Sequence, residues 1–141
     1  MVRFLDANIP MYAAGGDHRL REPSRQVIYD AGRNSREYVT SVEVCQEIIH
    51  RYLAIGRWEA LGRRALQDFL TLMSGRIESV YQADVVTAAR LADRYAPARP
   101  QSRDLFHVAV MQRLGVREIV STDTGFDSIP DVTRIDPLTF A

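Results

Sequence analysis

Apolar runs of strand length alternate with longer helical patterns along the whole 141-residue chain, and this alternation constrains the fold more than any other feature. It is typical of an α/β domain with a mainly parallel sheet. A chain of this length buries enough surface to fold without a disulfide or a structural metal. Because there is no linker, repeat or low-complexity tract, residues 1–141 are expected to form one domain. The five expected strands span residues 2–5, 38–40, 77–80, 118–121 and 132–135.

Helices are expected between these strands, bounded by residues that commonly start or stop a helix. Pro23 lies in the first turn of one helix and Gly32 at its end, while Ser41 and Ser102 are placed to cap two others. Residues 8–12 are expected to form a loop or a short helix. The longer helices are expected at residues 23–32, 42–55, 59–73, 83–95 and 105–114.

Composition excludes several classes of protein. All 18 basic residues are arginine, so the chain has no Walker A loop, no Schiff-base lysine and no receiver-domain lysine. The formal net charge is zero, and contacts with nucleic acid therefore have to come from local arginine clusters. Cys45 is the single cysteine and is expected to be a small buried side chain in a reducing compartment. No signal peptide or membrane span is recognisable, which predicts a cytoplasmic protein with no membrane association.

Two aspartates directly follow predicted strands. Asp6 comes after the first strand, and Asp123 follows the fourth, behind Ser121 and Thr122. In an open parallel sheet, ligands bind at the carboxyl ends of the strands, so both carboxylates are expected at the same rim. The alternative is that each aspartate caps a turn or a helix, a common role after a strand.

Two helices contribute further acids. Asp104 lies in the first turn of a largely apolar helix, where it either stabilises the helix dipole or faces the rim of the sheet. Glu43 and Glu47 are one turn apart on another helix, so their charges repel. Glu47 either pairs with Arg51 on a solvated face or leans towards the other acids.

If these acids lie close together, their negative charges must be compensated. At 4 Å, two unit charges repel by about 4 kcal/mol at an effective dielectric constant near 20. Such a cluster needs protonated members or a divalent cation, and oxygen ligands alone favour Mg²⁺ or Mn²⁺. No metal-ligand spacing connects the three histidines, which are expected to be structural: His18, His50 and His107.

Four short motifs carry a resemblance to a known family. They are Phe4-Leu-Asp6-Ala-Asn8, Thr40-Ser-Val-Glu-Val-Cys-Gln-Glu47, Ser102-Arg-Asp104-Leu-Phe-His107 and Ile119-Val-Ser-Thr-Asp123. With these motifs the chain resembles PIN-domain nucleases over essentially its whole length, and more narrowly the toxin ribonucleases of VapBC toxin–antitoxin systems. The resemblance implies a PIN-like three-layer α/β/α sandwich with strand order 3-2-1-4-5.

The resemblance also implies a metal-dependent endoribonuclease that binds Mg²⁺ or Mn²⁺ in an acidic pocket. The residues that match its catalytic and metal-binding acids are Asp6, Glu47, Asp104 and Asp123. Supporting candidates lie close to these positions: Asn8, Glu43, Ser121, Thr122 and Asp127. Family members often carry a further acid two residues beyond Asp123, where this chain has Gly125, so a second metal ion is less well supported than the first.

Partners also follow from the resemblance, which implies transfer or ribosomal RNA as substrate, a VapB-type antitoxin and a homodimer. The helices between residues 23 and 73 offer a surface for such partners. Arginines outside the pocket are candidates for binding RNA phosphates: Arg19, Arg21, Arg25 and Arg51.

Two rival functions stay open on the sequence. One is a degenerate PIN module that binds RNA or protein without cutting, which is consistent with Gly125. The other is a different Mg²⁺-dependent phosphohydrolase, a class that usually needs an aspartate where Asn8 stands and a lysine that this chain lacks.

Overall fold

The structure, a computed structural model, describes residues 1–140 and contains a five-stranded sheet of order β3-β2-β1-β4-β5. All four neighbouring pairs are parallel, which confirms the predicted sheet and strand order. β3 is shorter than predicted, because its only neighbour among residues 1–140, β2, ends at Ser41, which pairs with Glu78. The strands are β1 (Arg3–Leu5), β2 (Tyr38–Ser41), β3 (Ile77–Glu78), β4 (Glu118–Val120) and β5 (Thr133–Ile135).

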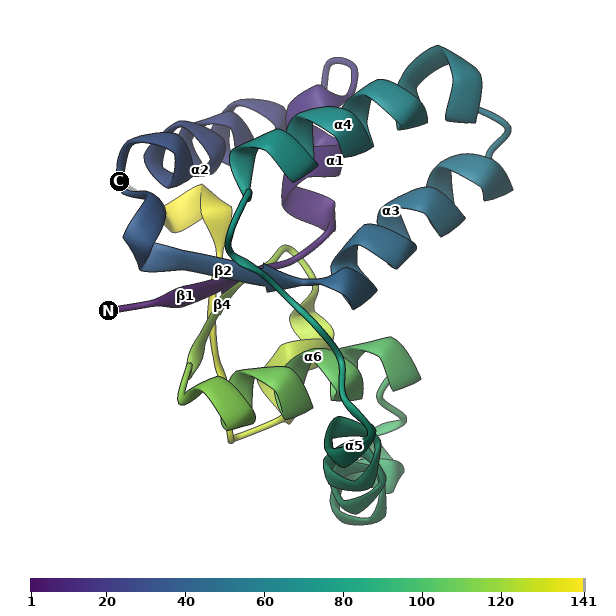
Figure 1. The fold of residues 1–141 in the computed structure, drawn as a ribbon, viewed down its shortest axis with the longest axis vertical. Helices are drawn as coiled ribbons and strands as arrows, with labels where there is room; N and C mark the ends of the chain where they lie inside the picture. Colours follow the sequence, from purple (N-terminus) through teal and green to yellow (C-terminus); the bar gives the residue numbers. More distant parts are fainter. Residues whose placement is uncertain (141) are drawn as a thin grey trace.

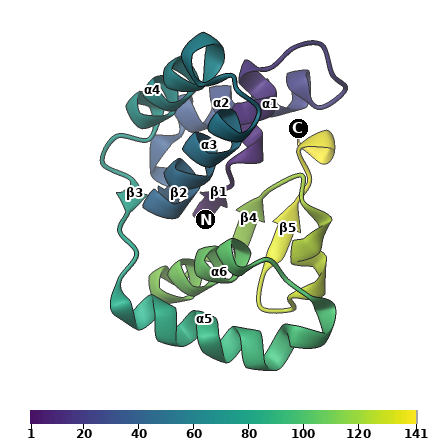
Figure 2. The same ribbon diagram turned by 90° about the vertical axis from the view of Figure 1, so that its right-hand side faces the viewer.

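Helices cover both faces of this sheet and make three layers. Figure 1 shows α1 to α4 on one face and α5 with α6 on the other, and Figure 2 shows the same layers after a quarter turn. Among residues 1–140, no helix has both the length and the apolar character needed to span a bilayer. The helices are α1 (Asn8–Ala14), α2 (Arg21–Arg33), α3 (Val42–Ala54), α4 (Arg63–Leu72), α5 (Gln82–Tyr95) and α6 (Ser102–Leu114).

Several predicted helix boundaries were wrong by a few residues. α2 continues through Gly32 to Arg33, and α6 begins at Ser102 itself, so Ser102 is not the cap. Ser41 occupies the N-cap position of α3 as predicted but makes no capping hydrogen bond. Before α4, residues 58–62 form a π-helical turn. A Cβ at Gly62 would lie 2.6 Å from the Cβ of Tyr52, so this close contact requires glycine.

The two central strands, β1 and β4, end side by side inside the buried core. Phe4 and Leu5 of β1 and Val120 of β4 are completely buried, and Leu5 pairs in register with Val120. The backbone N–H of Asp6 donates to the carbonyl of Val120 at 3.2 Å. The residues that follow β1 and β4 therefore leave the sheet side by side at its carboxyl end.

Candidate metal centre

Four acidic side chains from four elements meet at this rim. Asp6 follows β1, Glu47 lies in the middle of α3, Asp104 lies in the first turn of α6, and Asp123 comes after β4. Asp6, Glu47 and Asp104 are only 2%, 3% and 6% exposed, respectively, and Asp123 is half-buried. The structure thus brings together the residues that the sequence analysis selected as catalytic and metal-binding candidates.

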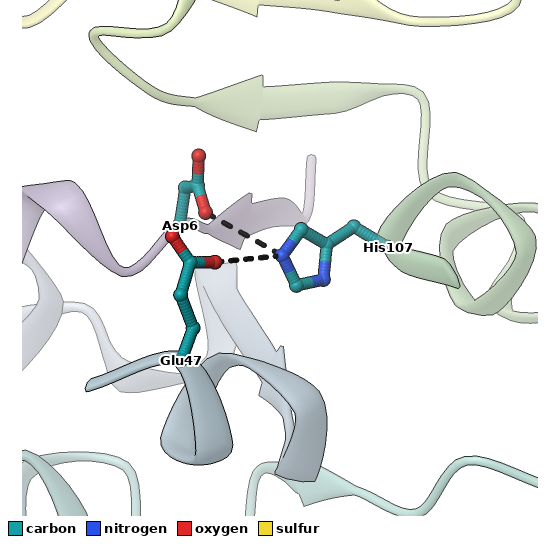
Figure 3. A group of neighbouring side chains, drawn as sticks. All are labelled: Asp6, Glu47 and His107. Atoms are coloured by element: carbon teal, nitrogen blue, oxygen red, sulfur yellow. Dashed lines mark hydrogen bonds and ion pairs between the residues drawn. The ribbon is translucent and has the colours of Figure 1, made fainter. Parts of the chain in front are cut away.

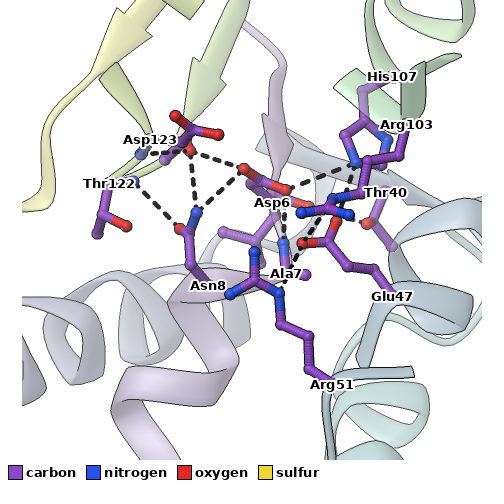
Figure 4. Close-up of polar contacts among 12 residues, drawn as sticks. Asp6, Ala7, Asn8, Thr40, Glu47, Arg51, Arg103, His107, Thr122 and Asp123 are labelled. Carbon is purple, nitrogen blue, oxygen red and sulfur yellow. Dashed lines mark hydrogen bonds and ion pairs between the residues drawn. The ribbon is translucent and has the colours of Figure 1, made fainter. Parts of the chain in front are cut away.

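Asp6 is held by three hydrogen-bond donors. The backbone N–H of Ala7 donates to Oδ1 at 2.8 Å, and the hydroxyl of Ser121 donates to Oδ2 at 2.7 Å. The side-chain amide of Asn8 also donates to Oδ2, at 3.2 Å, as Figure 4 shows. Two of the supporting candidates, Asn8 and Ser121, therefore fix the orientation of the Asp6 carboxylate.

Asp123 is positioned by the turn that carries it. Its backbone N–H donates to Ser121 Oγ at 3.0 Å, and the backbone N–H of Thr122 donates to Asn8 Oδ1 at 3.1 Å. The backbone N–H of Gly125 donates to Asp123 Oδ1 at 2.8 Å. A Cβ at position 125 would lie 3.0 Å from that oxygen, so a glycine here lets the backbone approach and orient the carboxylate.

His107, which was expected to be structural, lies in contact with the acids. Its side chain is completely buried, and Nε2 lies 3.4 Å from Glu47 Oε1 and 3.6 Å from Asp6 Oδ1 (Figure 3). The three residues offer ligand atoms within 4.8 Å of one another. The sequence is consistent with this placement, because His107 follows Asp104 by three residues and shares its face of α6.

Glu47 pairs with two arginines at its other oxygen. Arg51 Nε lies 3.2 Å and Arg103 Nε 3.4 Å from Glu47 Oε2. One of the two sequence alternatives predicted that Glu47 pairs with Arg51 on a solvent-exposed face of its helix. The pair is present, but the predicted exposure of Glu47 was wrong. Glu47 is buried because α3 contacts α6 as well as the sheet, a tertiary contact that a helical wheel omits.

Other sequence candidates lie outside this cluster. Glu43, one turn before Glu47, is partly exposed and forms no ion pair with a side chain of residues 1–140. Asp127 is exposed and binds Arg134 through two contacts of 2.9 Å and 3.2 Å. Arg25 donates its Nε hydrogen to the carbonyl of Ala13 at 3.0 Å. Thr122 contributes its backbone N–H to the rim.

Burial and like charges control the ionisation of these acids. Burial raises the pKa of Asp104 to about 7, helped by the charges of Asp6 and Asp123. The pKa of Asp6 is also raised, mainly by burial. Burial alone would raise the pKa of Glu47, but the hydrogen bond with His107 and the neighbouring cations lower it overall. Negative charge is therefore compensated at Glu47 and left uncompensated around Asp104.

These residues fit a hard divalent cation. The carboxylate of Asp104 forms no hydrogen bond or ion pair within residues 1–140, and the surrounding candidate ligands are carboxylate oxygens, which Mg²⁺ and Mn²⁺ prefer. His107 fits the role of counter-charge better than that of ligand. A metal-binding histidine normally donates its second N–H, whereas the Nδ1 atom of His107 is buried without a partner in the described chain.

A cavity of about 410 Å³ opens beside the acids. Asp6, Glu47 and Asp123 line one part of it, and Tyr12 and Tyr52 lie among the residues of the rest. A substrate therefore has access to the carboxylates despite their burial.

Replacement of His107 by Leu is expected to destabilise the metal-free protein by about 3 kcal/mol, because two buried carboxylates lose their counter-charge. Thermal denaturation in EDTA measures the loss. A saturating divalent cation is expected to raise the Tm of this variant more than that of the wild type. His50→Leu, at an exposed position of α3, is the control. Equal Tm values for His107→Leu and wild type in EDTA would contradict the counter-charge role.

Comparison with known proteins is consistent with this geometry. The family model for the PIN domain matches residues 3–132. Ribonuclease VapC13 of Mycobacterium tuberculosis is 34% identical over 134 residues, covering 93% of this chain and 97% of that protein. Ribonuclease VapC23 of the same species is 37% identical over 122 residues, covering 85% and 91%. The crystal structure of VapBC2 from Rickettsia felis bound to a promoter DNA fragment superposes with a TM-score of 0.70 at 16% identity, covering 96% of this chain and 98% of that one.

Proposed function

The chain belongs to the PIN-domain family, and on this premise we propose what the protein does. It is a metal-dependent endoribonuclease that hydrolyses RNA phosphodiester bonds, and it acts as the toxin of a VapBC-type toxin–antitoxin pair. The relatives named ribonuclease cover most of the chain and are matched over most of their own length. The observation that carries this proposal is the group of four carboxylates at the sheet rim, three of them buried, in which Asp104 has a raised pKa and no hydrogen-bond donor in the described chain.

The ion of this centre is Mg²⁺ or Mn²⁺ in our proposal, held by Asp6 and Asp104 with Asp123 and Glu47 beside them. A bound divalent cation supplies an activated water and neutralises charge on the phosphate during hydrolysis. The chain itself supplies rigidity. Ser121, Asn8 and the N–H of Ala7 fix Asp6, so its oxygens need little reorganisation when a cation and substrate arrive.

The proposed partners are an RNA substrate and a small VapB-type antitoxin. The similar Rickettsia felis structure is a VapBC complex, and the fold of this chain matches it over nearly its full length. A homodimer and a cytoplasmic location are parts of the same proposal. Sedimentation of the purified chain at monomer mass would contradict the dimer.

The proposed activity is tested with total cellular RNA and purified, antitoxin-free protein. We expect discrete new RNA ends with Mg²⁺ or Mn²⁺ and none with EDTA. Sequencing of the ends identifies the substrate. RNA binding without cutting, in the presence of either metal and with an intact fold, would instead favour the degenerate binding module.

A further inference from the structure

Two arginines from different helices converge on one oxygen at the mouth of the acidic centre. Arg51 lies on α3 and Arg103 on α6, and the Nε atom of each is within 3.4 Å of Glu47 Oε2. Figure 4 shows the two guanidinium groups approaching Glu47. Their side chains are 42% and 29% exposed, so both guanidinium groups are accessible to a ligand.

Both guanidinium groups have unused hydrogen-bonding capacity. A guanidinium carries five N–H donors in a planar fork. Within residues 1–140, the only polar partner of Arg51 and of Arg103 is Glu47. By contrast, Arg113 is occupied by the carboxylate of Asp84 and the carbonyl of Ser79. Arg113 is thus engaged by polar groups of the protein itself, whereas Arg51 and Arg103 keep N–H donors free at the rim.

Glu47 has more cationic neighbours than its single charge requires. Its Oε1 faces His107, while its Oε2 faces both arginines. One guanidinium is sufficient to pair a carboxylate in a bidentate geometry. The second guanidinium is therefore free to pair with another anion at the mouth, and the planar fork of arginine matches the oxygens of a phosphate.

We propose that Arg51 and Arg103 form a clamp that holds the scissile phosphodiester of the RNA against the acidic centre. The inference rests on the proposed ribonuclease function and identifies residues that bind its substrate. A phosphate brought to this rim meets four acidic side chains, and the two guanidinium groups offset that repulsion. Because α3 and α6 lie on opposite faces of the sheet, the clamp fixes the phosphate relative to both halves of the centre.

The cavity beside the clamp has room for the attached nucleotide. Arg51 lines this space together with Met11, Tyr12 and Ile55. At about 410 Å³ the cavity accommodates a nucleobase, and aromatic side chains provide favourable stacking surfaces for bases. A phosphate held by Arg51 thus places its base next to an apolar and aromatic wall.

The clamp is tested by RNA binding under conditions that prevent cleavage. A fluorescein-labelled 12-nucleotide single-stranded RNA is titrated with protein in an Asp104→Asn background, with Ca²⁺ and at several KCl concentrations. We expect Arg51→Ala and Arg103→Ala each to weaken binding about tenfold, the effect of losing a charged hydrogen bond. The double variant is expected to lower the salt slope by about 0.7, the value for one phosphate contact on a single strand.

Two controls separate substrate binding from a purely structural role. Arg51→Lys keeps the charge and is expected to keep the salt slope, while Arg90→Ala, at an exposed position of α5, is expected to bind RNA like the parent. Calorimetric titration with Mn²⁺ of otherwise wild-type variants measures whether the arginines act only through Glu47.

The outcomes distinguish failure of the clamp from failure of the proposed function. If the double arginine variant binds RNA with the affinity and salt slope of Arg90→Ala, and only Mn²⁺ affinity changes, the clamp is wrong and the arginines position Glu47. If the wild-type protein neither binds nor cuts RNA, the ribonuclease proposal itself is wrong.

Discussion

An Asp6→Asn variant is expected to lose metal-dependent RNA cleavage by about 1000-fold or more while keeping its fold. Asp6 is the buried carboxylate on which Ser121, Asn8 and the Ala7 N–H converge. Asparagine has nearly the same shape and keeps one oxygen for the Ala7 N–H, while the hydroxyl of Ser121, which already accepts from the Asp123 N–H and the Asn8 amide, loses the acceptor for its own hydrogen. The substitution removes the negative charge that we propose holds the cation, and a bound cation contributes several kcal/mol of transition-state stabilisation.

The measurement is the initial rate of RNA cleavage with Mg²⁺, together with a thermal melt that reports the fold. Asp93→Asn, an exposed aspartate of α5, is the matched control and is expected to cleave at the wild-type rate. Cleavage by Asp6→Asn above about a tenth of the wild-type rate would show that Asp6 does not hold the catalytic ion.

The sequence predicted those features that depend on local patterns. Buried parallel strands alternating with helices predicted the sheet, and the positions of Asp6 and Asp123 directly after strands placed them at the same rim. Strand ends coincide in space because the parallel strands stack in register, as Leu5 does with Val120. For Asp6 and Asp123, a position directly after a strand was enough to predict that both lie at this rim.

Features created by contacts between distant elements escaped the sequence analysis. The residue pattern of α3 left Glu47 open between a solvated face and the acidic rim, because a helical wheel contains no α6 to cover the side chain. Arg103 and His107 gain their importance from the same contact, 56 and 60 residues away from Glu47 in the chain. Gly125 interrupts the family pattern in sequence, yet in the structure its N–H orients Asp123.

The metal-free wild-type protein is expected to lose stability as the pH rises from about 5 to 7. The pKa of Asp104 is about 7 in the folded protein, against an ordinary value of 3.8, so the folded state retains a proton that the unfolded chain has released. Raising the pH through this window therefore favours unfolding, by roughly 2 kcal/mol in total. The raised pKa of Asp6 acts in the same direction, while the lowered pKa of Glu47 acts at lower pH.

Replacement of Asp104 by Asn is expected to remove much of this pH dependence and, with it, the catalytic activity. The asparagine side chain carries no charge to repel Asp6 and Asp123, and the carboxylate that it replaces has no hydrogen bond to lose within residues 1–140. In EDTA at pH 8 we expect a Tm about 5–10 °C above that of the wild type. Mg²⁺ should raise the Tm of the wild type and leave that of the variant nearly unchanged. Two results would contradict this: a wild-type Tm in EDTA that does not change between pH 5 and 8, or a variant that melts below the wild type at pH 8. Either would show that the uncompensated charge of Asp104 does not lower the stability of the metal-free protein, and so is not a charge that the fold holds ready for a cation.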